Sequence, residues 1–515
     1  MTSPVEVAVP PGAADQAVGG GPGDTAPEPV EATEDEGGAT PSERRRRGLH
    51  LAAYLAAFLV PSGVMDLWFT LRSTTNVVFA DTWAFVPMLG RTLSGHFSMG
   101  MLWAAHNENR QPFLRAAFLL SASFDHFNTM HLRAFGILVL LAEEAVLLLI
   151  AFRIKTPALR IVVGVAVALL ASSVGQWESM LLEENWMFFL TVAGAATALV
   201  LLERQLQTRP LLGNGPLTLV GVAAAATVAS LSLAGGLVTW PVLVLRAATY
   251  GPYRRHLRVA GLLAGAGVVE SVLYAWDMPG GGLGTRTAFH QPLLLIVKFF
   301  VLCMGASLYN VGASSARFVA GEIIGSLFTL GLVACVVAAW RSQVLRRDPL
   351  FGLGLALAVF GTGEALFIEY GRITMGITLA FGSRYTTLTQ TVPIGLLFCA
   401  AAVVDRRLNA TVPLRARQRG LVALAGVVGV VALMGFGVSL NDESQWLDSA
   451  HYAFYFQSLT QDLTTTRPVS DAQLNAFEWA PATIRSAEKV LRRFHLSVYA
   501  GRSAVGPPAT GSAGP

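Results

Sequence analysis

The sequence carries little charge and little cysteine for its length. Charged residues are 14% of the 515 residues, against roughly 25% in a typical soluble domain. The chain therefore lacks the charge that a soluble fold of this size needs to cover its surface. Its three cysteines, Cys303, Cys335 and Cys399, all lie inside apolar runs, which excludes a disulfide framework and a cysteine-rich metal site. Apolar residues instead make up 53% of the chain, and this indicates an integral membrane protein.

Arginines gather in short clusters between the apolar runs, and the net charge is only +4. This pattern is typical of cytoplasmic membrane loops and not of a nucleic-acid-binding face, so no nucleic-acid partner is expected. Residues 1–42 are mostly Gly, Pro, Ala, Glu and Asp and cannot bury enough apolar surface to fold. Four arginines at 44–47 and the apolar run 49–70 follow. They indicate a retained signal anchor with the N-terminus in the cytoplasm.

A transmembrane helix needs about 20 mostly apolar residues to cross roughly 30 Å of hydrocarbon. A further apolar run, 291–309, is predicted to be a re-entrant or interfacial helix, because only then do the arginines of all the basic loops lie on the cytoplasmic side. The sequence predicts about eleven crossings, near 49–70, 132–152, 158–175, 186–203, 216–233, 235–249, 258–276, 320–340, 350–368, 388–404 and 420–439.

The predicted fold is therefore an all-α, polytopic transmembrane helix bundle in three regions. Residues 1–48 form a disordered cytoplasmic tail, and 49–439 form the transmembrane domain with a large outer loop at 72–131. Residues 440–515 form an extracytoplasmic C-terminal segment with a disordered end. We expect the protein to act at its outer face, because the loops rich in polar and aromatic residues all lie there: 72–131, 176–185, 277–319 and 369–387.

The first outer loop holds two polar motifs between aromatic residues. Asp81-Thr82-Trp83 opens a predicted amphipathic helix to about residue 94, and five polar residues follow at 106–110. A carboxylate here can take a proton from an acceptor hydroxyl, with polar neighbours to orient it. The alternatives are an interfacial helix with solvated charges and, for Asp81, a helix cap. We predict that Asp81 and the run 106–110 share one cavity.

Two later outer loops add candidate ligands. The loop 176–185 carries Glu178, Glu183 and Glu184, which could align a sugar or bind a divalent metal, although no aspartate-rich triad or histidine pair supports the metal. In the loop 369–387, Arg372 and Arg384 lie twelve residues apart, and guanidinium groups suit a phosphate or pyrophosphate. The alternative for these arginines is anchoring to lipid head groups.

Taken in order, these motifs resemble those of a family of bacterial membrane proteins related to the GT-C class of glycosyltransferases. The resemblance covers roughly residues 50–500, and its most specific part is the last motif. Many GT-C enzymes carry two adjacent acids in the first outer loop, whereas this chain has Asp81 beside Thr82. The matching motifs are Asp81-Thr82-Trp83, His106-Asn107-Glu108-Asn109-Arg110, Glu184-Asn185-Trp186, Gly371-Arg372 and Ser383-Arg384-Tyr385-Thr386-Thr387.

The resemblance implies an inverting transfer of a sugar from a polyprenyl-phosphate lipid to a cell-envelope glycan acceptor, at the outer face of a bacterial plasma membrane. It implies that Asp81 is the general base, with Glu108 as the second catalytic carboxylate. No cofactor is implied. The expected substrate-binding residues are His106, Asn107, Arg110, Glu184, Asn185, Arg372, Arg384 and Tyr385.

Two other interpretations remain open. A transporter or flippase of a lipid-linked glycan typically shows internal repeats and broken helices, and the sequence has no clear repeat. A non-catalytic membrane scaffold would not need the polar run 106–110. We prefer a glycosyltransferase because the polar residues gather at one face and not along a path through the membrane.

Overall fold

The computed structural model describes residues 41–207, 215–250, 254–278, 290–310, 315–409, 414–465 and 469–501. The first 40 residues of the predicted tail, part of the loop 277–319 and the end 502–515 lie outside the described residues. The chain divides into two compact units, Met1–His50 and Leu51–Pro515. The description below concerns the second unit.

Helices dominate the described residues, and nine of them are long and apolar enough to cross a membrane. These crossings are formed by α1 (Pro41–Ser73), α5 (Thr129–Ala151), α6 (Pro157–Ala171) with η2 (Val174–Gln176) and α7 (Trp177–Leu181), α8 (Trp186–Gln207), α11 (Arg254–Ala275), α14 (Ser315–Arg341), α16 (Pro349–Arg372) with η4 (Ile373–Met375), α17 (Ser383–Thr389) with α18 (Thr391–Asn409), and α19 (Leu414–Thr464). Shorter apolar helices are α4 (Pro112–Phe124), α9 (Gly215–Ser230), η3 (Ala234–Val238) with α10 (Thr239–Thr249), and α13 (Leu293–Ala306).

The remaining elements are short and lie mostly in the loops. They are η1 (Ala80–Ala84), α2 (Val86–Leu93), α3 (Met99–Trp103), the hairpin β1 (Ala105–His106) and β2 (Asn109–Arg110), α15 (Gln343–Arg347), η5 (Ile377–Phe381), α20 (Asp471–Asn475), α21 (Pro481–Arg493) and η6 (Ser497–Tyr499).

The all-α, polytopic class predicted from the sequence is confirmed, and the chain is a multi-pass membrane protein. Two of the expected crossings, 216–233 and 235–249, correspond to the short helices α9 and α10. The chain turns between them at Gly236, where an added Cβ would lie only 2.1 Å from the carbonyl oxygen of Ala229. The helix α13 has 14 residues, fewer than the roughly 20 of a full crossing, in keeping with the predicted re-entrant helix.

Two predicted region boundaries fall inside helices. The boundary at 48/49 lies within α1, and the boundary at 439/440 lies within α19, which continues for 51 residues to Thr464. A change from apolar to polar composition does not end a helix, because the backbone hydrogen bonds are made within the segment in either environment. The structure therefore joins the last crossing and the start of the C-terminal segment in one helix.

Close helix contacts in the bundle depend on small residues. At the contact of α16 with α18, a Cβ at Gly354 would lie 2.6 Å from the carbonyl oxygen of Gly395, and a Cβ at Gly395 would lie 2.4 Å from that of Gly354. Lipid offers no hydrophobic drive for helix association, so such backbone approach supplies the packing energy.

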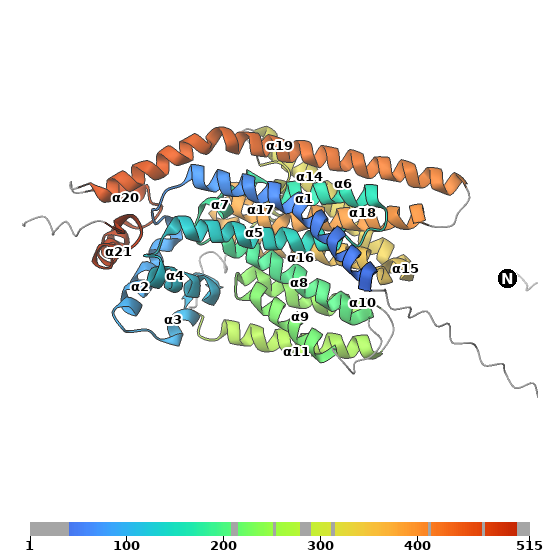
Figure 1. Cartoon of the computed structure of the whole chain (residues 1–515), viewed down its shortest axis with the longest axis horizontal. Helices are drawn as coiled ribbons and strands as arrows, with labels where there is room; N and C mark the ends of the chain where they lie inside the picture. Colours follow the sequence, from blue (N-terminus) through green and yellow to red (C-terminus); the bar gives the residue numbers. More distant parts are fainter. Residues whose placement is uncertain are drawn as a thin grey trace, which may run out of the picture. The chain divides into compact units, whose positions relative to one another are not determined.

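The first outer loop is covered by the C-terminal segment at one end of the helices. Figure 1 shows α2, α3, α4 and α21 together at the left, whereas α15 lies at the right. Phe477 is fully buried and packs edge-on against Trp83 with ring centroids 5.7 Å apart. The carbonyl of Phe477 accepts the N–H of Ala80 (3.2 Å), and the carbonyl of His126 accepts the N–H of Ser497 (2.6 Å).

Candidate active site

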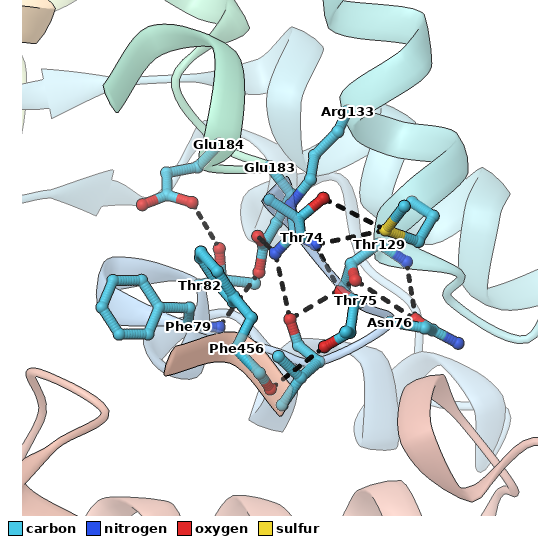
Figure 2. Close-up of polar contacts among 12 residues, drawn as sticks. Thr74, Thr75, Asn76, Phe79, Thr82, Thr129, Arg133, Glu183, Glu184 and Phe456 are labelled. Atoms are coloured by element: carbon cyan, nitrogen blue, oxygen red, sulfur yellow. Dashed lines mark hydrogen bonds and ion pairs between the residues drawn. The ribbon is translucent and has the colours of Figure 1, made fainter. Parts of the chain in front are cut away.

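A buried ion pair fixes the backbone that leads into the first outer loop. The side chains of Arg133 in α5 and Glu183 have no solvent exposure and lie 2.6 Å apart (Figure 2). Arg133 also donates to the carbonyls of Thr75 (2.5 Å) and Val77 (3.1 Å). The second oxygen of Glu183 accepts the N–H of Phe79 at 3.1 Å. Because both charges are buried and paired, this segment is held in one conformation.

Glu184 holds the turn that contains the candidate base. Thr82 in η1 donates its hydroxyl to Glu184 Oε2 at 2.7 Å (Figure 2). Burial, followed by the charges of Glu183 and Asp81, raises the pKa of Glu184 well above its ordinary value. The neutral form is therefore favoured, and the carboxyl group acts here as the acceptor for Thr82.

Asp81 lies in the first turn of η1 and faces His106. Its Oδ2 is 3.7 Å from His106 Nε2, and the Asp81 side chain is 40% exposed. Burial acts to raise the pKa of Asp81, but the contact with His106 and the charges of Arg384 and Arg372 hold this pKa below its ordinary value. In the part of the chain that the structure describes, no backbone N–H donates to this carboxylate, and the N-cap of η1 is Phe79. The geometry thus favours a charged, reachable carboxylate over a helix cap.

His106 is presented by the hairpin of β1 and β2. The two strands pair antiparallel, and Asn107, with φ of 51°, forms the turn between them. The His106 ring contacts Phe85 with centroids 4.8 Å apart and stacks on Trp479 at 6.4 Å. Asn107 is exposed, with its Nδ2 3.5 Å from His106 Nε2. Aromatic contacts therefore orient the imidazole towards Asp81, and Asn107 supplies the turn.

Arg372 joins the hairpin to the late motif. Its Nη2 lies 2.6 Å from Glu108 Oε1, and its Nε donates to the hydroxyl of Tyr385 at 2.8 Å. The Arg372 and Glu108 side chains are 21% and 33% exposed, so the pair is at the surface of a cavity and not sealed. Glu108 is thus placed on Arg372 and not beside Asp81.

Arg384 lies at the start of α17, which Glu178 holds in place. Glu178 Oε2 accepts hydrogen bonds from Ser383 Oγ (2.9 Å) and the Arg384 N–H (3.1 Å). The guanidinium group of Arg384 lies over the ring of Tyr385 at 5.4 Å. Among the described residues, no carboxylate lies within 4.0 Å of this guanidinium group. Arg384 is therefore the cation of the site that is best placed to take an anion.

Two residues that we expect to bind substrate, Arg110 and Asn185, make buried contacts within the protein. Arg110 is buried, and its guanidinium group donates to the carbonyls of Tyr274 (2.6 Å), Trp103 (2.5 Å) and Trp276. Asn185 is also buried and donates to the carbonyl of Glu178 at 3.1 Å. Arg110 thus ties the first outer loop to the end of α11, and Asn185 closes its own loop at Glu178.

A cavity of about 280 Å³ opens beside Arg372. The carboxyl group of Glu364 is almost fully buried at this cavity, and its Oε1 has no hydrogen-bond partner. Polar groups on the wall come from Glu108, Asn109, Tyr274, Glu364, Arg372 and Tyr385. Apolar groups come from Phe188, Leu233, Leu237, Phe367, Ile368 and Leu388.

The prediction of one shared cavity is met only in part. Asp81 contacts the run 106–110 through His106. Of that run, however, Glu108 and Asn109 line the cavity, and Asp81 does not. The difference arises at the turn between the two strands, where Glu108 pairs with Arg372 while His106 faces Asp81.

The C-terminal segment supplies residues that the sequence did not indicate. Trp479 stacks on His106. Burial, followed by the charges of Glu178 and Asp81, raises the pKa of Glu478 against the opposing effect of Arg384. Glu478 and Glu178 also line a second cavity of about 180 Å³. No motif or sequence spacing connects residues 478–479 with Asp81, so only the folded structure shows that they belong to the site.

The three acids of the loop 176–185 each bind a different partner. Glu183 pairs with Arg133, Glu184 accepts from Thr82, and Glu178 holds α17. Within the described ranges, no group of three or more His, Cys, Asp or Glu side chains is placed to hold a metal ion.

No protein-family model matches the sequence, and no curated protein matches it. Among solved structures, the chain is similar to oligosaccharyltransferase AglB from Archaeoglobus fulgidus, in complex with an inhibitory peptide and a dolichol-phosphate, at 12% identity and a TM-score of 0.44 over 88% of this chain and 61% of that chain. It is also similar to ArnT from Cupriavidus metallidurans bound to undecaprenyl phosphate, at 12% identity and a TM-score of 0.41 over 86% of this chain and 89% of that chain.

A further structure of the Archaeoglobus fulgidus enzyme, tethered with an acceptor peptide, matches at 13% identity and a TM-score of 0.44, over 83% of this chain and 59% of that chain. The chain thus spans about three fifths of the length of the oligosaccharyltransferases it matches. These neighbours are GT-C glycosyltransferases, the class that the sequence resembles, and the likeness concerns the fold.

Proposed function

We propose that the protein transfers a sugar from a polyprenyl-phosphate donor to a cell-envelope glycan acceptor at the extracytoplasmic face of a bacterial plasma membrane. The observation that carries this proposal is the position of Asp81. Its charged carboxylate stands within reach of His106, and the guanidinium groups of Arg372 and Arg384 act on it from α16 and α17. A cavity with both apolar and polar lining residues opens beside Arg372.

In the proposed reaction, the acceptor hydroxyl attacks the anomeric carbon of the donor sugar. A new bond forms between that carbon and the acceptor oxygen, the bond to the lipid phosphate breaks, and Asp81 takes the hydroxyl proton. A single displacement of this kind inverts the anomeric configuration. His106 orients the carboxylate, since its own ring is fixed by Phe85 and Trp479.

In this proposal, Arg372 and Arg384 stabilise the leaving group, which is the lipid phosphate. A lipid phosphate gains negative charge as it leaves, and guanidinium groups stabilise this charge by paired hydrogen bonds. Arg384 does not line the cavity, but its guanidinium group lies over the ring of Tyr385, which does. Since no carboxylate lies within ion-pair distance of Arg384 among the described residues, we assign it a contact with the phosphate. Arg372 lines the cavity and is held by Glu108 and Tyr385. Glu108 thus positions Arg372, in place of the expected role as a second catalytic carboxylate.

The donor and the acceptor are assigned to different cavities. The larger cavity suits a polyprenyl chain next to a phosphate, because it has an apolar wall and includes Arg372. The smaller one is lined by Trp177, Tyr452, Tyr455 and the acid Glu478. Aromatic faces with nearby hydrogen-bond acceptors suit a sugar, so we assign the acceptor to this side.

The proposal is tested with purified protein in lipid nanodiscs, synthetic polyprenyl-phosphate sugars and an envelope glycan fragment. Both the transfer of the sugar and the binding of polyprenyl phosphate are measured. Arg384→Lys keeps the charge but loses the paired hydrogen bonds. We expect it to weaken binding of polyprenyl phosphate by about tenfold or more, since a hydrogen bond to a charged group contributes roughly 1.5–3 kcal/mol.

Arg407→Lys is the matched control, because Arg407 is exposed in the last turn of α18, away from the site. Unchanged binding by Arg384→Lys and Arg384→Ala contradicts the phosphate assignment. Passage of intact donor across a vesicle membrane, with no transfer to any acceptor, would instead identify a flippase.

A further inference from the structure

A separate apolar groove lies at the other end of α16. It encloses about 290 Å³ between α10, α14, α15 and α16. The helix α16 has 24 residues, about 36 Å of length, and it runs from this groove at Phe351 to the candidate site at Arg372. Because the hydrocarbon core is about 30 Å thick, the groove and the candidate site meet opposite faces of the bilayer. The groove walls include Val242, Leu245, Val336, Trp340, Leu355 and Val359.

The groove is open to lipid along its apolar wall. The Leu245 side chain is 51% exposed, Val336 is 44% exposed and Trp340 is 80% exposed. Tryptophan is enriched at the level of lipid head groups. The position of Trp340, one residue before the end of α14, is therefore that of an interfacial residue.

The rim of the groove carries positive charge that the protein does not neutralise. Arg246 is buried and paired with Glu203 at 2.7 Å, and it donates to the backbone carbonyl of Arg346 at 2.8 Å. Arg346 also lines the groove, and among the described residues no carboxylate lies within 4.0 Å of its guanidinium group. Asp348, nearby in the chain, is occupied by the start of α16 and by Arg406.

We propose that this groove binds an anionic phospholipid of the surrounding leaflet. The lipid phosphate lies on Arg346, and one acyl chain lies along the apolar wall between α14 and α16. Arginine suits this position because its planar group binds phosphate oxygens in pairs, and the exposed Arg341 at the end of α14 adds charge of the same sign. This site is independent of the transfer chemistry, because it shares no residue with the candidate active site.

The experiment uses the fluorescence of Trp340 and brominated lipids, which quench tryptophan on contact. The full-length protein is placed in phosphatidylcholine nanodiscs that contain equal small fractions of either brominated phosphatidylglycerol or brominated phosphatidylcholine. The signal of Trp340 is the difference between the wild type and Trp340→Phe. We expect the anionic lipid to be preferred by about fivefold, the ratio that one arginine near a membrane surface provides.

Two variants and one control decide the outcome. Arg346→Gln should remove the preference, and Val336→Phe, which fills the groove from an exposed position, should reduce quenching by the anionic lipid. Arg258→Gln removes the same charge from an exposed position in the first turns of α11, outside the groove, and should keep the preference. Equal quenching by both lipids in the wild type would show ordinary solvation by the bilayer and overturn the proposal. Loss of the preference in Arg258→Gln as large as in Arg346→Gln would also overturn it.

Discussion

Replacing Asp81 by Asn separates a catalytic carboxylate from a structural one. The substitution keeps the size and the polarity of the side chain but removes the proton acceptor. A general base contributes about 10²- to 10⁴-fold to the rate, so we expect transfer to fall by that factor. Stability should change by no more than about 1 kcal/mol, the usual contribution of a partly exposed charge pair, because Asp81 faces His106 at 3.7 Å and no backbone N–H among the described residues donates to it.

The assay measures transfer of labelled sugar, donor binding and the melting temperature of the same preparation. Asp125→Asn is the matched control, since Asp125 forms a comparable carboxylate–histidine contact with the exposed His131 at 2.8 Å, outside the candidate site. Full transfer activity in Asp81→Asn would refute the assignment. If the variant lost both its fold and its donor binding, Asp81 would be a residue that stabilises the fold.

The pKa of Asp81 also predicts a pH dependence. Its folded value lies below 3.8, so the carboxylate is charged throughout the neutral range. Any stabilisation from this charge is present above pH 3.8 and is lost as the pH falls through the lower folded value. Between pH 5 and pH 8, the profile of the transfer rate should therefore show no loss from protonation of Asp81.

Three further predictions address the framework and the topology. Glu183→Gln breaks a buried ion pair and should lower the free energy of unfolding by about 3–5 kcal/mol, whereas Glu184→Gln keeps a neutral acceptor for Thr82 and should cost far less, as thermal melting would show. Phe477→Ala removes a fully buried ring and should cost about 3–5 kcal/mol, with faster proteolysis of the first outer loop. Impermeant thiol reagents applied from outside should label Ser470→Cys but not Ser342→Cys, and labelling of the latter would reverse the proposed orientation.

Apolar length was enough to predict most of the crossings, because a bilayer leaves few alternatives to a helix. It also separated α9 from α10, but it counted both as crossings, although each of these apolar helices is shorter than a full crossing. It also placed a boundary inside α19, because a helix does not end where its surroundings change.

The candidate site was predictable where its residues lie close in sequence. The run 106–110 stood out by composition, but composition could not show that Arg110 turns to backbone carbonyls while His106 turns to Asp81. Arg133 was not expected at the centre of a network, because its partners are backbone groups and a distant carboxylate. Trp479 lies almost 400 positions from Asp81, so only the folded chain brings it to the site.

The covering of the first outer loop by α21 has a consequence for biosynthesis. The ribosome delivers the chain from its N-terminus, so η1 and α2 are made long before residues 469–501 exist. During that interval, Trp83 lacks Phe477, His106 lacks Trp479, and the candidate base is not yet held in its final surroundings. The site is therefore complete only after residues 469–501 have been made, and a chain terminated before them would lack both Phe477 and Trp479.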